Sequence, residues 1–314
     1  MERRDFLTSS IAAGAAVAAS GPLSASSLTQ PGAAASGAGK GRFKLAYAPH
    51  FGMFSSHAKD DLDQVSFAAD EGFAAWEDNG MRWRDENFHK AFAERMAKHK
   101  MRMGIFVAQD IDWEKPTLTT GDQAIREKFV KQTGESCEIA KRINATWVTT
   151  VVGRVAQNLP WGHQFCNVIE TLKRAAEVCE KSGSGMVMVI EPLNWRDHPG
   201  QFCPTSDVLR ALCRAVDSPH LKILQDLYHL QVTEGNLIDN MNRCWDDIAY
   251  IQLGDNPGRA EPGTGEVNYR NVFKHIQSRG FTGILGMEHG NSKGGSKEGE
   301  RSLINAYLAA DSGQ

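Results

Sequence analysis

The 314-residue sequence lacks several features that would place it in a functional class at once. It contains no run of lysine or arginine, and its formal charge is −3, so we expect neither nucleic acid nor an anionic membrane as a partner. The six cysteines form no CxxC pair and no metal-type spacing, and we predict mostly free thiols. No Gly-x-Gly-x-x-Gly follows the first predicted strand, which argues against an open dinucleotide-binding sheet.

The N-terminus carries an apolar run, Ile11 to Ala19, that is too short to span a bilayer. Arg3 and Arg4 precede it and are followed by Phe6 and Leu7, a pattern that resembles a twin-arginine export signal. We therefore predict that residues 1–40 are a signal peptide with a disordered linker, and that the mature protein is periplasmic or otherwise extracytoplasmic. The alternative is a disordered tail with a chance Arg-Arg pair.

No Pro/Gly/Ser-rich linker divides the chain after residue 40, so residues 41–314 are predicted to form one domain. Eight short apolar segments alternate there with segments that have helical spacing. The predicted strands are Phe43–Ala48, Ala74–Glu77, Met103–Ala108, Thr146–Val152, Gly185–Glu191, Lys222–Asp226, Ala249–Leu253 and Gly283–Glu288. The predicted helices include Phe88–Lys100, Ala124–Ile143, Asn167–Lys181, Ser206–Val216 and Tyr269–Ser278. Eight βα units in about 270 residues indicate a (β/α)₈ TIM barrel.

Polar residues end several of the predicted strands, at the edge where such barrels carry their chemistry. Glu191, Asp226, Gln252 and Glu288 end the fifth to eighth strands, about one βα repeat apart. Consecutive strands bring these residues to one rim, where three carboxylates would repel each other unless a cation neutralised them. Carboxylate and amide oxygens suit a hard ion, so we predict one divalent metal ion, Mg²⁺ or Mn²⁺.

Each rim residue also has an ordinary structural explanation. Asp226 alone could be the N-cap of a helix, and Gln252 alone a solvated strand end; their common register favours a site. His229 follows Asp226 by three residues and could lean over the same site, although single histidines are often structural. Arg259 lies in a glycine-flanked loop and is either solvated or a clamp for substrate. Further candidates for substrate contact, each at or just after a strand, are His50, Glu77 and Trp113.

Four segments together resemble the hydroxypyruvate isomerase branch of the xylose isomerase-like TIM barrels. They are Val-Ile-Glu-Pro-Leu-Asn at 189–194, Gln-Asp-Leu-Tyr-His at 225–229, Tyr-Ile-Gln-Leu-Gly-Asp at 250–255, and the stretch Pro-Gly-Arg-Ala-Glu-Pro-Gly-Thr-Gly-Glu-Val-Asn-Tyr at 257–269. The likeness extends from about residue 43 to the C-terminus and is strongest in the second half.

The resemblance implies roles for individual residues. Glu191, Asp226, Gln252 and Glu288 match positions that bind the metal. Those matching Glu191 and Glu288 also act as the acid/base pair, and the position matching His229 contacts a substrate oxygen. Arg259 falls in the segment that holds substrate. One departure is His289, where related isomerases usually have tyrosine after the last glutamate.

These residues favour an isomerase or epimerase of a small hydroxy-carbonyl compound, such as a sugar, a keto-sugar or a hydroxypyruvate-like acid. Proton removal next to the carbonyl would give a cis-enediolate, stabilised by the metal. A lyase or dehydratase that uses the same enolate remains open, as does an exported sugar-binding barrel without catalysis. A metal-dependent phosphodiesterase acting on DNA is disfavoured by Gln252 and the acidic chain. The exact substrate and any homo-oligomer are left open.

Overall fold

The protein is described here from a computed structural model that covers residues 42–312. The predicted export signal, residues 1–40, lies outside the described residues. Within residues 42–312, no helix is both long enough and apolar enough to cross a membrane. All six cysteines fall in this range and are free thiols.

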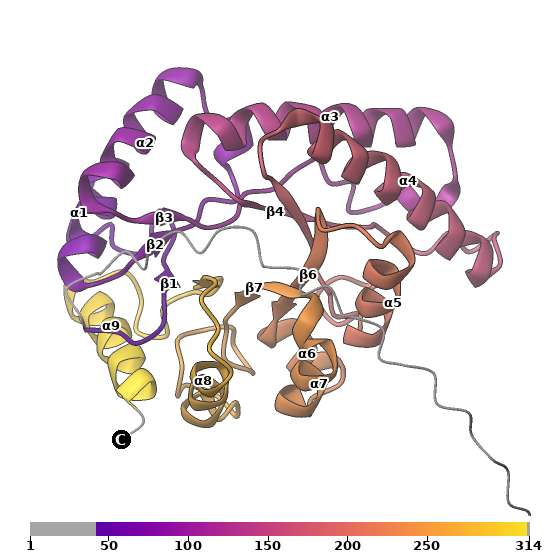
Figure 1. Cartoon of the computed structure of the whole chain (residues 1–314). Coiled ribbons are helices and arrows are strands. Elements are labelled where there is room, and N and C mark those ends of the chain that lie inside the picture. The colour runs from indigo at the N-terminus through magenta and orange to yellow at the C-terminus, as the bar shows by residue number, and fades with distance from the viewer. Residues whose placement is uncertain (1–41, 313–314) are drawn as a thin grey trace, which may run out of the picture. The chain divides into compact units, whose positions relative to one another are not determined.

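Eight parallel strands form the inner layer, each inside or overlapping one of the predicted segments (Figure 1). They are β1 (Tyr47–Ala48), β2 (Ala75–Trp76), β3 (Arg102–Met103), β4 (Trp147–Thr150), β5 (Val187–Ile190), β6 (Leu221–Asp226), β7 (Ile248–Gln252) and β8 (Leu285–Gly286). Six are paired in the order β1-β8-β7-β6-β5-β4, and β2 pairs with β3. Isolated parallel bridges, His50 to Glu77 and Val107 to Thr149, join the two sheets. The strands therefore follow one another around a TIM barrel, as predicted.

Helices cover the outside of the strands (Figure 1). They are α1 (Asp61–Glu71), α2 (Glu86–His99), α3 (Gln123–Ile143), α4 (Trp161–Ser182), α5 (Ser206–Val216), α6 (Leu227–Thr233), α7 (Leu237–Cys244), α8 (Tyr269–Ser278) and α9 (Lys297–Ser312). Short 3₁₀ turns lie at Met81–Trp83, Leu118–Thr120 and Trp245–Asp247. The five helices predicted by their bounds are all present, four of them within two residues at each end, while α4 begins six residues earlier than predicted.

Local sequence explains where the helices begin and end. Asp60 and Asp122 accept hydrogen bonds from the first free backbone N–H groups of α1 and α3, which is the usual role of an N-cap aspartate. Gly72 and Gly183 end α1 and α4 with positive φ, a conformation that glycine adopts without steric cost. These signals are local, so they fix the length of each βα unit before the barrel closes.

Two apolar layers hold the barrel together. The larger lies between the strands and the surrounding helices and includes most of the buried leucine, isoleucine and phenylalanine side chains. The smaller includes Val189, Leu224 and Tyr250, whose side chains alternate along their strands with those of the outer layer. Since both faces of each strand are buried, the strands appear in the sequence as continuous apolar runs rather than alternating ones.

Candidate active site at the carboxyl rim of the barrel

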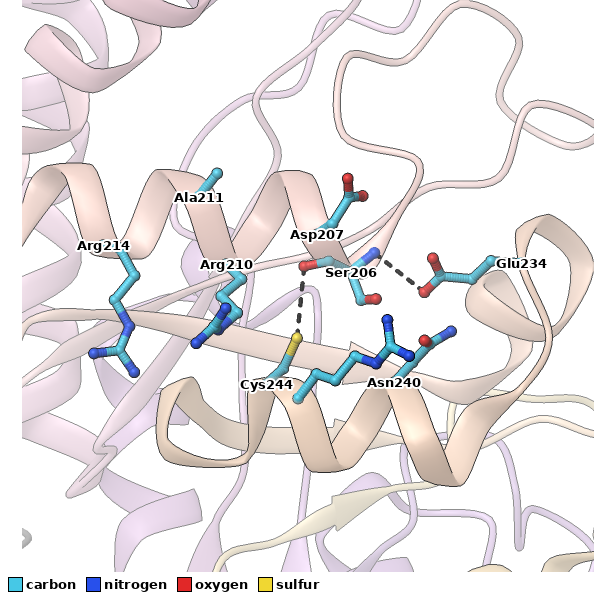
Figure 2. A pocket seen from close by; sticks show the side chains of 9 residues that line it. Ser206, Asp207, Arg210, Ala211, Arg214, Glu234, Asn240 and Cys244 are labelled. Atoms are coloured by element: carbon cyan, nitrogen blue, oxygen red, sulfur yellow. Dashed lines mark hydrogen bonds between the residues drawn. The ribbon is translucent and has the colours of Figure 1, made fainter. Parts of the chain in front are cut away.

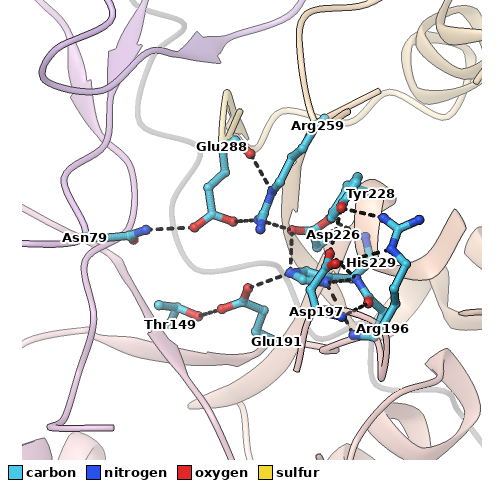
Figure 3. Close-up of polar contacts among 12 residues, drawn as sticks. Asn79, Thr149, Glu191, Arg196, Asp197, Asp226, Tyr228, His229, Arg259 and Glu288 are labelled. Atoms are coloured by element: carbon cyan, nitrogen blue, oxygen red, sulfur yellow. Dashed lines mark hydrogen bonds and ion pairs between the residues drawn. The ribbon is translucent and has the colours of Figure 1, made fainter. Parts of the chain in front are cut away.

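Glu191 and Asp226 mark the carboxyl ends of neighbouring strands β5 and β6. Glu191 directly follows β5, is buried, and its Oε2 accepts a hydrogen bond from Thr149 Oγ1 of β4 at 3.2 Å. Asp226 is the last residue of β6 and also the N-cap of α6, with Oδ1 accepting from the His229 backbone N–H at 2.9 Å. Asp226 can therefore be both the helix N-cap and a rim residue, because Oδ1 caps α6 and Oδ2 faces the rim (Figure 3).

His229 lies between these carboxylates. Its Nε2 is 3.8 Å from Glu191 Oε1 and 3.9 Å from Asp226 Oδ2. Its Nδ1 accepts from the backbone N–H of Asn194 at 3.3 Å and lies 2.7 Å from Asn194 Nδ2. Because a backbone N–H only donates, a neutral ring must carry its hydrogen on Nε2, directed to the rim. Burial and the charge of Arg259 lower the pKa of His229 to about 3, so the ring is neutral near pH 7.

Glu288 follows β8 and is held from two sides. Asn79 Nδ2, beyond β2, donates to Oε1 at 2.8 Å, and Arg259 Nη2 donates to Oε2 at 2.5 Å. The same Arg259 nitrogen lies 3.5 Å from Asp226 Oδ2, and its guanidinium stacks on Tyr228. Figure 3 shows Glu288 and Glu191 approaching one space from different strands, with Arg259 and Asp226 beside it.

The loop after β7 positions Arg259. Buried Asp255 accepts hydrogen bonds from the backbone N–H groups of Gly263, Gly265 and Val267, at 2.9 to 3.0 Å. These bonds fold the loop back on itself and leave Arg259 at its tip, with a φ of 47°. Arg259 Nε then donates to the Glu288 backbone carbonyl at 3.0 Å. Asp255 is therefore the organiser of the loop that delivers Arg259 to the rim.

Electrostatic coupling links the rim groups. Burial raises the pKa of Glu191 well above its usual range, and the charges of Glu288 and Asp226 raise it further. Burial also raises the pKa of Asp226, opposed by Arg259 and by hydrogen bonds from the α6 backbone. Three carboxyl groups thus face a single guanidinium, an arrangement that leaves negative charge for a cation to balance.

Gln252 and Glu77 lie deeper in the barrel. Gln252 ends β7 and is fully buried, yet within residues 42–312 neither atom of its amide makes a well-formed hydrogen bond. Glu77 directly follows β2, is 1% exposed, and its Oε2 accepts from Tyr250 of β7 at 2.8 Å. Burial and the charge of Glu288 raise the pKa of Glu77, while Tyr250 and the nearby Gln252 amide oppose that rise. The structure thus places Glu77 beside Gln252 rather than at the mouth.

The other predicted contacts are distributed around the mouth. Trp113 is 44% exposed and stacks on His198, whose ring is 5.4 Å from that of His229. His50, after β1, has one ring nitrogen 2.8 Å from the Phe51 carbonyl and the other 3.3 Å from the His289 carbonyl, and its neutral ring can donate to one of them. His289 is turned away from the rim and bonds to Tyr307 of α9 at 2.6 Å. Trp113 is therefore adjacent to the His229 side of the site, whereas His50 braces the β8 end.

The loops after β4 and β5 pair with each other at the edge of the mouth. Val155 N–H donates to Gly200 O at 2.8 Å, and Phe202 N–H donates to Gly153 O at 3.0 Å. An antiparallel bridge joins Arg154 to Gln201 between them. The two loops thus form one small ribbon on the side of the mouth where His198 lies.

Sequence reasoning assigned no role to Asn79, Thr149, Asn194 or Tyr250, which hold the rim side chains in place. Thr149 carried a weak signal, since Thr149 and Thr150 are consecutive polar residues inside an apolar strand. Asn79 and Asn194 lie in loops, and their partners are 209 and 35 residues away in the sequence. No local pattern identifies such pairs.

The donor set fits a divalent metal ion. Glu191, Asp226 and His229 offer ligand atoms that all lie within 4.8 Å of one another. The unpaired Gln252 amide and the Glu288 carboxylate lie at the ends of the next two strands. Since the His229 hydrogen is on Nε2, the oxygen atoms are the better ligands and His229 the better hydrogen-bond donor. We therefore retain Glu191, Asp226, Gln252 and Glu288 as the predicted ligands.

A separate hollow of about 700 Å³ lies on the outer layer, between α5 and α7 (Figure 2). Its lining includes Arg210, Arg214 and Arg243. Arg210 and Arg214 face Asp247, and Arg243 pairs with Asp239 of its own helix. The lining also contains two acidic side chains, Asp207 and Glu234, so the hollow has charges of both signs and favours no one class of charged ligand.

Comparison with known proteins agrees with the fold. The model of the family described as xylose isomerase-like TIM barrel matches residues 65–306, and the chain belongs to that family. The 2-oxo-tetronate isomerase of Cupriavidus necator is 29% identical over 238 residues, which are 76% of this chain and 89% of that protein. The hydroxypyruvate isomerase of Escherichia coli is 31% identical over 163 residues, 52% of this chain and 62% of that protein.

Among solved structures, an AP endonuclease of family 2 from Brucella melitensis superposes with a TM-score of 0.72 at 21% identity. The match covers 84% of this chain and 98% of that one. At this identity the likeness concerns the fold alone, because one barrel serves many chemistries through different rim residues.

Proposed function

We propose that the protein is a metal-dependent isomerase or epimerase of a small hydroxy-carbonyl compound, with Glu191 and Glu288 as its acid/base pair. The observation that carries the proposal is the convergence of three carboxylates, from β5, β6 and β8, around neutral His229 and Arg259. The family and the two isomerase relatives support the reaction class.

The residues of the chain account for the proton transfers. Burial and the neighbouring carboxylates raise the pKa of Glu191, which strengthens this carboxylate as a proton acceptor. Asn79 and Arg259 hold the two oxygens of the Glu288 carboxylate and so fix its direction toward the space that Glu191 also faces. A bound divalent ion would supply positive charge against the two substrate oxygens when the proton next to the carbonyl is removed.

His229 and Arg259 would orient the substrate. The Nε2–H of a neutral imidazole can donate to a carbonyl or hydroxyl oxygen without adding charge. Arg259 is partly buried between the Tyr228 ring and the rim carboxylates, which strengthens its interaction with an anionic group. Trp113 and His198 would form the outer wall against which the rest of the molecule packs.

The test is solvent deuterium incorporation at carbon, followed by NMR. Purified protein is incubated with Mn²⁺ or Mg²⁺ and a panel of hydroxypyruvate, 2-oxo-tetronate and ketoses. We expect metal-dependent exchange in the wild type and a loss of at least a hundredfold in Glu191→Gln and in Glu288→Gln. Glu94→Gln, which changes an exposed glutamate of α2, is the matched control and should exchange normally.

The other outcomes separate the alternatives. Exchange accompanied by loss of water or of a carbon fragment would replace the isomerase by a lyase or dehydratase. Tight binding of a panel compound, seen as a thermal shift, with no exchange at any metal concentration would contradict catalysis and favour a sugar-binding barrel.

A further inference from the structure

Glu77, Tyr250 and Gln252 form a polar group inside an otherwise apolar part of the barrel. Glu77 comes from the end of β2, and its carboxylate reaches across β8 to the Tyr250 hydroxyl of β7, 2.8 Å away. Tyr250 and Gln252 are two residues apart on β7, so their side chains point to the same face. All three side chains are at most 1% exposed. Burial of a carboxyl group costs folding free energy unless hydrogen-bond partners compensate for it.

Two glycines provide the space that the Glu77 and Tyr250 side chains occupy. A Cβ on Gly286 of β8 would lie 2.0 Å from Glu77 Oε2, and one on Gly104 would lie 2.4 Å from the Tyr250 hydroxyl. Neither glycine needs a positive φ, so their role is space rather than backbone freedom. Any side chain at Gly286 would displace the Glu77 carboxylate. The Glu77–Tyr250 pair is therefore built into the packing of β3, β7 and β8.

The orientation of the Gln252 amide decides whether this residue can bind a metal ion. An amide presents an oxygen or an NH₂ group depending on a 180° rotation, and only the oxygen can bind a metal ion. Gln252 has no well-formed hydrogen bond among the described residues, and Glu77 is the carboxyl group bonded to Tyr250, two residues before Gln252 on β7. Tyr250 already donates to Glu77, so it holds that carboxylate on the face of β7 to which the Gln252 side chain also points.

We propose that Glu77 is a positioning residue, whose carboxylate accepts from the Gln252 NH₂ group and so presents the Gln252 carbonyl oxygen to the metal ion. The inference rests on the proposed function, because it needs Gln252 as a ligand. It explains why a carboxylate just past the end of β2 is buried beneath the rim rather than open to substrate. Tyr250 supports the arrangement by fixing the Glu77 carboxylate from the other side.

The experiment is a double-mutant cycle read by Mn²⁺ binding to metal-free protein, with isothermal titration calorimetry. Glu77→Gln should weaken Mn²⁺ binding by tenfold or more, as is usual when the partner of a metal ligand is lost. In the Gln252→Glu background both terminal atoms of residue 252 are oxygens, and orientation no longer matters. There, Glu77→Gln should leave Mn²⁺ affinity unchanged or increase it, because it also removes a like charge.

Three results would decide against the proposal. An equal loss of affinity in both backgrounds would indicate a packing role for Glu77, and no loss in the Gln252 background would remove the role altogether. If Glu77→Gln does not fold, Tyr250→Phe takes its place and should weaken Mn²⁺ binding only in the Gln252 background; a loss in both would again overturn the proposal. Failure of the wild type to bind Mn²⁺ would instead contradict the proposed function itself.

Discussion

His289 is a buried histidine that the sequence singled out because relatives usually have tyrosine there. Its ring stacks on Tyr307 at 5.7 Å between centroids and bonds to the Tyr307 hydroxyl, so it joins β8 to α9. Burial lowers the pKa of His289 to about 4, against 6.5 for an exposed histidine. The neutral ring is thus part of the wall of the barrel rather than of the substrate pocket.

This pKa predicts acid sensitivity. Between pH 6.5 and 4 the unfolded chain binds a proton at this histidine and the folded protein does not. Stability should therefore fall as the pH drops through this range, by up to roughly 3 kcal/mol from this residue. Urea unfolding of metal-free protein at pH 7 and pH 4.5 should show a smaller pH effect in His289→Gln than in wild type. His163→Gln, at an exposed position on α4, is the control; an unchanged pH effect in His289→Gln would contradict the assignment.

At the residue scale, the sequence predicted the rim carboxylates because each one ends an apolar strand. Glu191, Asp226 and Glu288 could be found by this rule, since the barrel register alone brings them together. The supporting contacts could not be found. Whether Glu77 faces the mouth or the barrel interior depends on the missing side chain of Gly286, which only the packed strands reveal. The hydrogen position on His229 likewise depends on Asn194, from another loop.

At the scale of elements, α9 closes the N-terminal end of the barrel through one carboxylate. Asp311 is 3% exposed and accepts from the backbone N–H groups of Lys44 and Leu45 at 2.6 and 3.3 Å, and from the Tyr47 hydroxyl at 2.8 Å. The last helix thus binds the segment that leads into the first strand. Since Leu45 and Tyr47 are buried, their donors would otherwise lack partners, and the contact contributes to stability directly.

We predict that Asp311→Asn lowers the free energy of unfolding by about 2 kcal/mol. The substitution keeps the volume of the side chain but directs an NH₂ group at donors on β1 or just before it. Urea denaturation followed by circular dichroism would measure the change. Asn305→Ala, at an exposed position in the middle of the same helix, should cost less than about 0.5 kcal/mol. Equal stability of Asp311→Asn and wild type would show that the contact is unimportant.

The elements were predicted more completely than the site, for a physical reason. Amphipathic helices such as α5 and α8 record their buried face within their own sequence, and both were predicted with the observed bounds. The strands were predicted because both of their faces are buried. Helix α6 has no spacing signal of its own, since its seven residues begin at Leu227, directly after β6; only the reading of Asp226 as an N-cap pointed to it.

At the scale of the whole molecule, the described domain is compatible with export in a folded state. Its six cysteines are free, and five of them are buried, so the barrel does not depend on disulfides formed after export. We propose that residues 1–40 direct the protein to the twin-arginine pathway. Replacement of Arg3 and Arg4 by lysine should then retain most of the protein in the cytoplasm, as measured by cell fractionation. An unchanged distribution would contradict the proposed signal.

The ribbon formed by the loops after β4 and β5 has a consequence for any attempt to change the substrate range of this barrel. Backbone hydrogen bonds join Gly153 to Phe202 and Val155 to Gly200. In a library of variants, the two loops should therefore be treated as one unit. Randomising either loop alone would break its partner's register before it altered the pocket. Variants should therefore change both loops together. The loop that carries Arg259 is folded by its own Asp255 but is also bonded to the segment after β8, where Gly290 N–H donates to Arg259 O, so these two segments likewise belong in one library.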